Sequence, residues 1–334
     1  MKESSADNSK QRAIDQLKKA RNTGDDGLLL AIASGNRSAL AQGITRVETG
    51  HSDWLSQMPP TSKKSIRIGI SGVPGAGKST LIESLGMLLV DQGMRVAVLA
   101  IDPASPVSKG SILGDKTRME RLSMHERAFV RPSSNGTTLG GVTKSTREAM
   151  HLCEHAGYDI IIIETVGVGQ SEIAVRAMCD YFLLLLLAGA GDQLQGIKRG
   201  IMEICDGIAI TKADGENTSN AQNAVGEFTT ALHYFPARDH GLMPQVIAIS
   251  AQENRGIDTL WQMIQHAYSY LDDRGLVEQN RQTQYLSWLH EMIREQTVAQ
   301  FYLNNKTAIE AAEISIKSKQ STPYVAANYI LKNS

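Results

Sequence analysis

Short apolar runs alternate with longer amphipathic stretches between residues 65 and 273. Most of the short runs are continuously apolar rather than alternating, which is typical of strands that helices cover on both faces. The runs expected to form strands are SIRIGIS (65–71), RVAVLAID (95–102), YDIIIIET (158–165), YFLLLLLA (181–188), GIAIT (207–211) and QVIAIS (245–250). This rhythm predicts an α/β fold with a doubly wound, mainly parallel sheet.

Both ends of the chain show helical spacing without strand runs. Residues 1–60 contain QRAIDQLKKA and SALAQGITRVE and end at the break MPPTSKK. In the last part, apolar residues recur at helical spacing, among them Tyr285, Leu289, Met292 and Ile293. We therefore predict a helical N-terminal extension (1–60), a central α/β domain (61–273) and a helical C-terminal arm (274–334).

Charge and composition limit the partners and the cellular location that we expect for the protein. Lys and Arg total 34 against 35 for Asp and Glu, so the net charge of −1 gives no indication of nucleic acid or an anionic membrane as partner. The longest apolar run, YFLLLLLAGA (181–190), is too short to span a bilayer. The N-terminus resembles no targeting peptide, and Cys153, Cys179 and Cys205 form no close pair. We expect a cytoplasmic protein.

The stretch SGVPGAGKST (71–80) lies between an apolar run and a helical pattern. It matches the phosphate-binding pattern G-x-x-x-x-G-K-[ST] completely, and strand before and helix after are the context that this loop requires. Backbone N–H groups and the helix N-terminus would bind the phosphates, Lys78 would bridge the β- and γ-phosphates as the catalytic residue, and Ser79 would ligate Mg²⁺. The predicted contacts are Gly72, Val73, Pro74, Gly75, Ala76, Gly77, Lys78, Ser79 and Thr80.

Two later strand ends indicate that the base is guanine. The run GIAIT leads into TKAD (211–214), which is similar to the Asn-Lys-x-Asp pattern of many GTPases with Thr211 in place of Asn. Asp214 would accept hydrogen bonds from guanine N1–H and the 2-amino group, which adenine lacks, and Lys212 would lie over the base. After the next strand, Ser250, Ala251 and Gln252 would present a backbone N–H to the guanine carbonyl. Thr211 leaves open how strongly GTP is preferred to ATP.

Glu164 ends a third strand, in IETVGVGQSE, where GTPases usually have Asp-x-x-Gly. Its carboxylate would reach Mg²⁺, and the Gly167 N–H would meet the γ-phosphate as part of a switch. Asp102 ends the strand RVAVLAID at the same edge, and Asp115 lies in the Gly-flanked loop GSILGDKTRM. Both acids also suit an ordinary cap or turn.

Five stretches together resemble the MeaB/ArgK/MMAA group of P-loop GTPases, in the SIMIBI class: SGVPGAGKST, IDPASPVSKGSILGDKTRM, ETVGVGQSE, GAGDQLQGIKRG and TKADGEN. The resemblance covers roughly residues 30–300. It implies a homodimeric GTPase that uses GTP/GDP and Mg²⁺ and gates the loading or removal of cofactor in an adenosylcobalamin-dependent acyl-CoA mutase, typically methylmalonyl-CoA mutase. It also implies that Asp102, Asp115 and Glu164 surround Mg²⁺ with Ser79, and that the C-terminal helices form a dimerisation arm. We expect slow hydrolysis that rises when the partner is present.

Two other functions fit parts of the sequence. A SIMIBI GTPase that inserts nickel into a metalloenzyme would need metal ligands, and the densest candidate is HLCEH (151–155). There Lys144, Glu148, His151 and His155 share one helical stripe, which we interpret as a solvated face with Cys153 turned to the core. A kinase-like partner of an amino-acid transport system is the other alternative, although no protein-kinase catalytic-loop pattern occurs.

Overall fold

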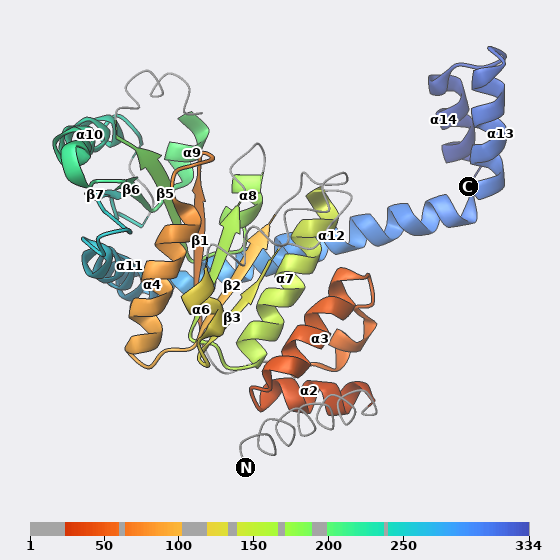
Figure 1. The fold of residues 1–334 in the computed structure, drawn as a ribbon. Helices are drawn as coiled ribbons and strands as arrows, with labels where there is room; N and C mark the ends of the chain where they lie inside the picture. Colours follow the sequence, from red (N-terminus) through yellow and green to blue (C-terminus); the bar gives the residue numbers. More distant parts are fainter. Residues whose placement is uncertain are drawn as a thin grey trace. The chain divides into compact units, whose positions relative to one another are not determined.

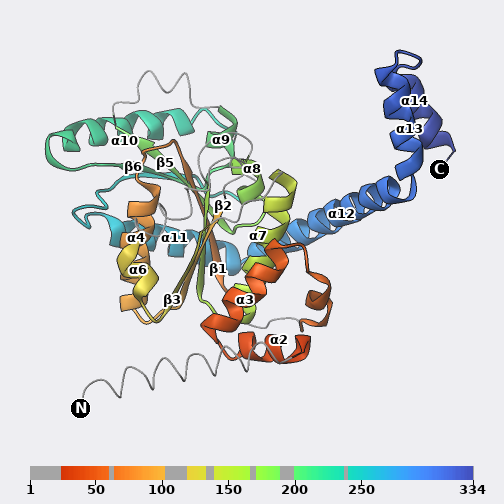
Figure 2. The same cartoon turned by 45° about the vertical axis from the view of Figure 1, so that its right-hand side comes forward.

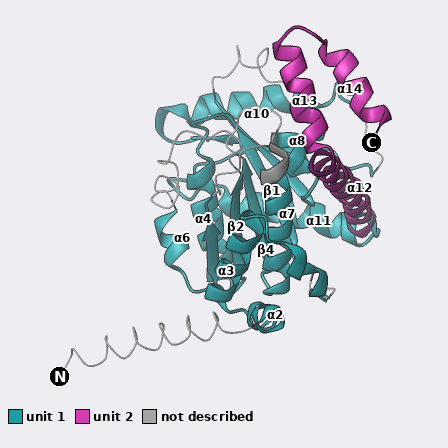
Figure 3. Cartoon of the chain, turned by 90° about the vertical axis from the view of Figure 1, so that its right-hand side faces the viewer, with its two compact units in different colours: residues 1–277 teal, residues 278–334 magenta. Residues whose placement is uncertain are grey.

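The computed structural model describes residues 24–59, 64–101, 119–132, 139–165, 171–188, 199–236 and 240–333. The chain divides after Val277 into two compact units, which Figure 3 colours separately. The first unit contains the sheet with its helices, and the second contains helices alone.

One seven-stranded sheet forms the centre of the first unit (Figure 1). Every neighbouring pair of strands is parallel, in the order β3-β2-β4-β1-β5-β6-β7. The strands are β1 (Ile66–Gly72), β2 (Val96–Ile101), β3 (Ala128–Arg131), β4 (Ile160–Thr165), β5 (Tyr181–Leu187), β6 (Gly207–Thr211) and β7 (Gln245–Ala248). The predicted fold class is confirmed, and each of the six expected runs contains a strand.

The edge strand β3 lies outside the six runs that were expected to form strands. Its four residues, AFVR, pair with β2 alone and are too few to show a period. A strand of this length therefore depends on the neighbouring strand more than on its own pattern.

Helices cover both faces of the sheet, and Figure 2 shows α4, α6 and α11 on one side of it and α7 on the other. The first face carries α4 (Lys78–Asp91), α6 (Glu120–Met124) and α11 (Ile257–Asp272), and the second carries α7 (Leu139–His155), α8 (Ser171–Arg176), α9 (Arg199–Ile204) and α10 (Thr218–Leu232). Successive residues of β4 alternate between the two cores: Ile160 and Ile162 enter one, and Ile161 and Ile163 enter the other. This explains why the central runs are continuously apolar.

The N-terminal helices belong to the same compact unit and cover α7. They are α2 (Asp25–Ala33) and α3 (Arg37–Glu48), followed by a 3-10 turn at Asp53–Gln57. The prediction of a solvated stripe on α7 is wrong for Glu148, which is 3% exposed and accepts a hydrogen bond from Ser52 Oγ at 2.9 Å. Nothing in the pattern of α7 itself shows that another helix pair lies against this face. Cys153 is buried in the core as expected.

The second unit consists of most of α12 (Leu276–Asn304) with α13 (Lys306–Lys317) and α14 (Pro323–Lys332). Thr322 begins α14 by accepting the Val325 N–H at 3.3 Å, with Pro323 in the first turn. Along α12, Leu286, Leu289 and Ile293 are 60%, 50% and 52% exposed. Among the described helices, none has the length and apolar character needed to cross a membrane.

Candidate nucleotide-binding site

The loop between β1 and α4 has the backbone conformation that its glycines allow. Gly75 and Gly77 have φ angles of +81° and +84°, which a residue with a side chain adopts only at a cost. A Cβ at either position would meet no heavy atom within 4 Å, so backbone conformation rather than space requires glycine there. The Ala76 N–H closes a tight turn on the Val73 oxygen at 3.1 Å. The first N–H groups of α4, from Lys78 to Thr80, follow directly and form an anion-binding helix terminus.

Gly72 is required for a different reason. A Cβ on this residue would lie 2.6 Å from the backbone oxygen of Leu185 on β5, so only glycine allows the two strands to approach here. Lys78 is 8% exposed, and its Nζ donates to the Gly72 and Val73 oxygens at 2.8 and 3.2 Å. The ammonium group therefore lies over the loop, where two backbone oxygens accept its hydrogen bonds. Pro74 at the tip of the loop is exposed.

Ser79 and Glu164 meet although 85 residues separate them. Ser79 Oγ donates to Glu164 Oε1 at 3.3 Å, and both side chains are 8% exposed. Because parallel strands end at one edge, the end of β4 lies beside the start of α4. Hydroxyl and carboxylate oxygens are the ligands that Mg²⁺ prefers, so this pair fits the predicted metal site.

The two predicted base-binding loops also lie together. Ser250 Oγ donates to Asp214 Oδ2 at 2.8 Å, and the Ala213 N–H donates to the Ile249 oxygen at 3.0 Å. Lys212 is exposed and has a φ angle of +56°, an uncommon conformation for a residue with a side chain. Its backbone oxygen accepts from Asn217 Nδ2 at 2.7 Å, which fixes this turn. Gln252 is exposed at the surface of the second loop.

Side-chain hydrogen bonds connect the base loops with the phosphate loop. Thr211 Oγ1 lies 2.7 Å from the oxygen of Ala76 and 3.1 Å from the oxygen of Leu186, so its single hydrogen is shared between two carbonyl groups. Ser84 on α4 donates to the Ala251 oxygen at 2.8 Å. The hydroxyl that replaces the usual Asn amide therefore has a structural partner in the phosphate loop.

Two residues that support the base loops lie outside the predicted motifs. One is Ser84, described above. The other is Arg255, whose Nη2 contacts the Ala213 oxygen and lies 3.3 Å from Thr218 Oγ1. The backbone of Arg255 also pairs with Ser250 in both directions, at 2.9 and 3.0 Å. Neither residue belongs to a nucleotide-binding motif, so only the three-dimensional contacts identify them. Of the predicted site residues, Asp102, Asp115 and Gly167 lie outside the described part of the chain.

Residues 40–306 match the family described as methylmalonyl-CoA mutase-associated GTPase MeaB. The chain belongs to this family of GTPases. Its relatives include GTPase ArgK of Escherichia coli (strain K12), which is 45% identical over 280 residues, 82% of this chain and 85% of the relative. The methylmalonic aciduria type A homolog, mitochondrial, of Mus musculus is 41% identical over 329 residues, which cover 92% of this chain and 79% of the relative.

A solved structure supports the same assignment. The crystal structure of LAO/AO transport system kinase has a TM-score of 0.70 and 34% identity, and it covers 92% of this chain and 96% of the other. The predicted resemblance is thus confirmed, and so is the enzyme class. This MeaB-family protein is a P-loop GTPase, whose family binds guanine nucleotides.

Proposed function

We propose that this GTPase is a chaperone of an adenosylcobalamin-dependent acyl-CoA mutase, and that it gates cofactor loading and exchange. The observation that carries the proposal is the match to a family described as mutase-associated, over residues 40–306. The relative named for methylmalonic aciduria supports methylmalonyl-CoA mutase as the partner.

In this proposal the phosphate loop and α4 bind the triphosphate. Loop N–H groups and the α4 terminus would bind the phosphate oxygens, and Lys78 would move from the Gly72 and Val73 oxygens to the β- and γ-phosphates. Positive charge at that place stabilises the charge that develops on the bridging and γ-oxygens during hydrolysis.

Ser79 and Glu164 are the described residues proposed to hold Mg²⁺, with Asp102 and Asp115 as further proposed ligands. The 3.3 Å hydrogen bond between the first two supports this, because it joins two buried oxygen donors beside the phosphate loop. When bound, the ion would neutralise phosphate charge. Gly167, two residues after the end of β4, is proposed to respond to the γ-phosphate.

Asp214 is proposed to select guanine, with Lys212, Ser250, Ala251 and Gln252 around the base. Ser250 donates to Oδ2 of Asp214, which holds the carboxylate in one orientation and leaves the other oxygen for the base. A carboxylate held in this way would accept from both donors of guanine and meet no such donor on adenine.

A homodimer is also part of the proposal. Leu286, Leu289 and Ile293 are each at least half exposed on α12, and Tyr302 further along the same helix is 60% exposed. Large apolar side chains exposed along a helix often mark an interface with another protein. We propose that a second copy covers them. Sedimentation of wild type and a Leu289→Asp, Ile293→Asp variant tests this, because a dimer that survives both charges would contradict it.

A cytoplasmic location is proposed as well, which the three buried, free cysteines support.

The central experiment measures phosphate release from GTP and from ATP, with and without stoichiometric methylmalonyl-CoA mutase. We expect turnover of GTP but not of ATP, and we expect it to be slow without the mutase and faster with it. A Lys78→Ala variant separates contaminating activity from that of this chain, because it should lose both rates. GTP turnover that ignores this mutase would contradict the partner, and rapid turnover without any partner would contradict the proposed regulation.

The alternatives receive less support from the described residues. For metal insertion, Cys153 is fully buried, and burial is the largest of the causes that raise its pKa far above the usual range. His151 instead contacts Glu154 at 3.1 Å, and the described residues contain no group of three or more His, Cys, Asp or Glu side chains suited to a metal ion. A kinase role would require transfer of phosphate to a protein, which incubation with labelled GTP or ATP and a binding-protein substrate would detect.

A further inference from the structure

A pocket lies near the amino ends of β6 and β7, at the edge of the sheet opposite the phosphate loop. We call it the amino-edge pocket; it has a volume of about 450 Å³, and its walls include Arg176, Met202, Leu232, Phe235, His240 and Met243. The last residues of α8, α9 and α10 line it, together with the segment that leads into β7. Its volume suits a small organic molecule.

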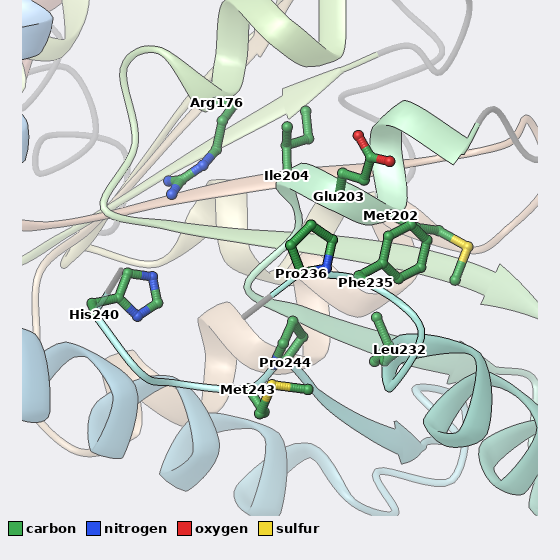
Figure 4. A pocket seen from close by; sticks show the side chains of 10 residues that line it. All are labelled: Arg176, Met202, Glu203, Ile204, Leu232, Phe235, Pro236, His240, Met243 and Pro244. Atoms are coloured by element: carbon green, nitrogen blue, oxygen red, sulfur yellow. The ribbon is translucent and has the colours of Figure 1, made fainter. Parts of the chain in front are cut away.

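The pocket has a polar end and an apolar end. Figure 4 shows the guanidinium of Arg176 and the ring of His240 on one side, and Met202, Phe235 and Leu232 on the other. Tyr270 on α11 donates to the His240 backbone oxygen at 3.3 Å, and the Leu242 N–H donates to His240 Nδ1 at 3.2 Å. These bonds hold the segment that forms one wall. His240 is therefore held in place in the wall of the pocket.

Arg176 supplies the positive charge at the polar end of the pocket. Its Nη1 lies 3.3 Å from Asp206 Oδ2, but that oxygen already accepts the Phe182 N–H at 2.8 Å. Nη1 itself is buried, whereas 26% of the whole side chain remains accessible, so a ligand in the pocket would have to bind through the other nitrogens of the guanidinium. A guanidinium carries five N–H donors in one plane and binds a carboxylate through two of them.

Glu203 places a negative charge on the opposite side of the pocket, which disfavours a second negative charge of a ligand there. It lines the pocket on the side of Met202 and is exposed (Figure 4). A carboxylate at the Arg176 end would avoid this negative charge, whereas a second carboxylate at the other end of a ligand would meet it. The pocket therefore favours one acidic group followed by a short apolar chain.

We propose that the amino-edge pocket binds a small monocarboxylate with a short apolar chain, and that this ligand is an effector of the nucleotide cycle. The carboxylate of the ligand pairs with Arg176, and its apolar chain contacts Met202, Leu232 and Phe235. The effector role follows from position in the chain: α8 begins four residues after Gly167, and α8 and α9 both end in this pocket. A ligand that binds one nucleotide state better shifts the balance between the states by that difference in affinity. The binding site does not rest on the proposed mutase partner.

Methionine methyl signals provide a local test of binding. Met202 and Met243 line the pocket, whereas Met87 on α4 and Met124 on α6 lie on the other face of the sheet. The GDP-bound chain, with labelled methionine methyls, is titrated with hexanoate, hexylamine and adipate. We expect saturable shifts at Met202 and Met243 with hexanoate at millimolar concentrations, and at least about tenfold weaker binding of the other two. Equal binding of hexylamine, or no saturable shift with hexanoate, would overturn the proposed ligand class.

Variants test the roles of the two charges. Arg176→Met keeps the apolar stem and removes the charge, so hexanoate should bind at least about tenfold more weakly. Because this change leaves Asp206 without its cation, Glu203→Gln provides a test that does not touch Arg176: adipate should gain affinity severalfold, and hexanoate should not change. Hexanoate binding that Arg176→Met leaves intact, or adipate binding that ignores Glu203→Gln, would contradict the assignment.

The effector role has its own readout. The same titration with a non-hydrolysable GTP analogue in place of GDP should change the hexanoate dissociation constant by about fivefold, which is within the usual range of coupling between sites. Identical constants in both states would reject the effector role and leave the site as a passive one.

Discussion

The two edges of the central sheet use their polar residues in opposite ways. At the carboxyl edge, the ends of β1, β4, β6 and β7 lead into the phosphate loop, Glu164, Asp214 and Ser250. At the amino edge, an aspartate directly precedes each of β4, β5 and β6 and accepts an N–H from the first residues of the neighbouring strand or from the residue just before it. These bonds are Arg95 N to Asp159 at 2.7 Å, Arg67 N to Asp180 at 2.9 Å and Phe182 N to Asp206 at 2.8 Å.

The difference separates carboxylates that stabilise the fold from polar groups that would contact the nucleotide. Carboxylates of the amino edge have partners within the chain, and so stabilise the strand starts. Polar groups of the carboxyl edge have short-range partners that a nucleotide could replace, such as the loop carbonyls that hold Lys78. Ligands bind outside the carboxyl ends of strands in open α/β sheets. Mutations that break buried ion pairs near the amino edge and mutations in the nucleotide-binding site should therefore affect different measurements.

The largest expected effect is on stability, from the buried ion pair near the amino edge. Arg67 is 1% exposed, and it donates through Nε and Nη2 to both oxygens of Glu154 at 2.7 and 3.0 Å. Arg67→Met leaves a buried carboxylate without its cation and should lower the free energy of unfolding by about 3–5 kcal/mol. Denaturant unfolding measures the loss. A double variant that also carries Glu154→Met should recover most of it, and no recovery would show that the cost lies in packing instead.

At the carboxyl edge, Lys78→Ala should affect GTP hydrolysis far more than stability. The change should lower the GTP hydrolysis rate by about 10²–10³-fold, because the positive charge at the γ-phosphate is lost. The free energy of unfolding should change less than for Arg67→Met, since the substitution removes a buried charge and leaves no opposite charge buried without a partner. Phosphate release and denaturant unfolding measured on one preparation compare the two effects. A stability loss as large as that of Arg67→Met would contradict the division between the edges.

The sequence predicted the phosphate half of the site because its determinants are local. Gly75 and Gly77 are needed for their own φ angles, and Lys78 and Ser79 follow them directly. The motifs also predicted the base residues Asp214 and Ser250, but the contacts that support the base loops join distant segments, such as Ser84 with Ala251 and Arg255 with Ala213. A single sequence contains no pattern for such contacts. For the same reason it did not reveal that α2 and α3 bury Glu148, or that β3 completes the sheet.

Acid should weaken the amino edge through Glu154. Burial alone would raise the pKa of this carboxyl, but the hydrogen bond from His151 and the charge of Arg67 outweigh it and lower the pKa from 4.5 to about 2. A folded-state pKa below the unfolded value contributes stability that is complete above pH 4.5 and is lost as the pH falls toward about 2. The shift corresponds to roughly 3 kcal/mol. The unfolding free energies of wild type and Glu154→Gln should therefore converge over this range, and a constant difference between them would contradict the assignment.

Substitutions in the base loops should change nucleotide selection more than stability. Asp214→Asn replaces one acceptor oxygen with a donor, so GTP affinity should fall by about a hundredfold. Xanthosine triphosphate, which carries a carbonyl in place of the 2-amino group, should gain affinity in the same variant. Competition with a fluorescent nucleotide measures both. Unchanged preference for GTP would show that Asp214 does not contact the base.

The smallest expected effect concerns the Thr211 hydrogen bond, which connects a base loop with the phosphate loop. Thr211→Val removes the hydroxyl that bonds the Ala76 oxygen at 2.7 Å and keeps the shape of the side chain. The loss of one buried hydrogen bond should cost about 1 kcal/mol of unfolding free energy. GTP affinity should fall about fivefold, because the phosphate loop and the base loop are no longer held at a fixed spacing. Thr211→Ser, which keeps the hydroxyl, should bind GTP like the wild type. If Val and Ser variants bind GTP equally well, this hydroxyl does not couple the loops, and the contacts of Ser84 and Arg255 alone position the base.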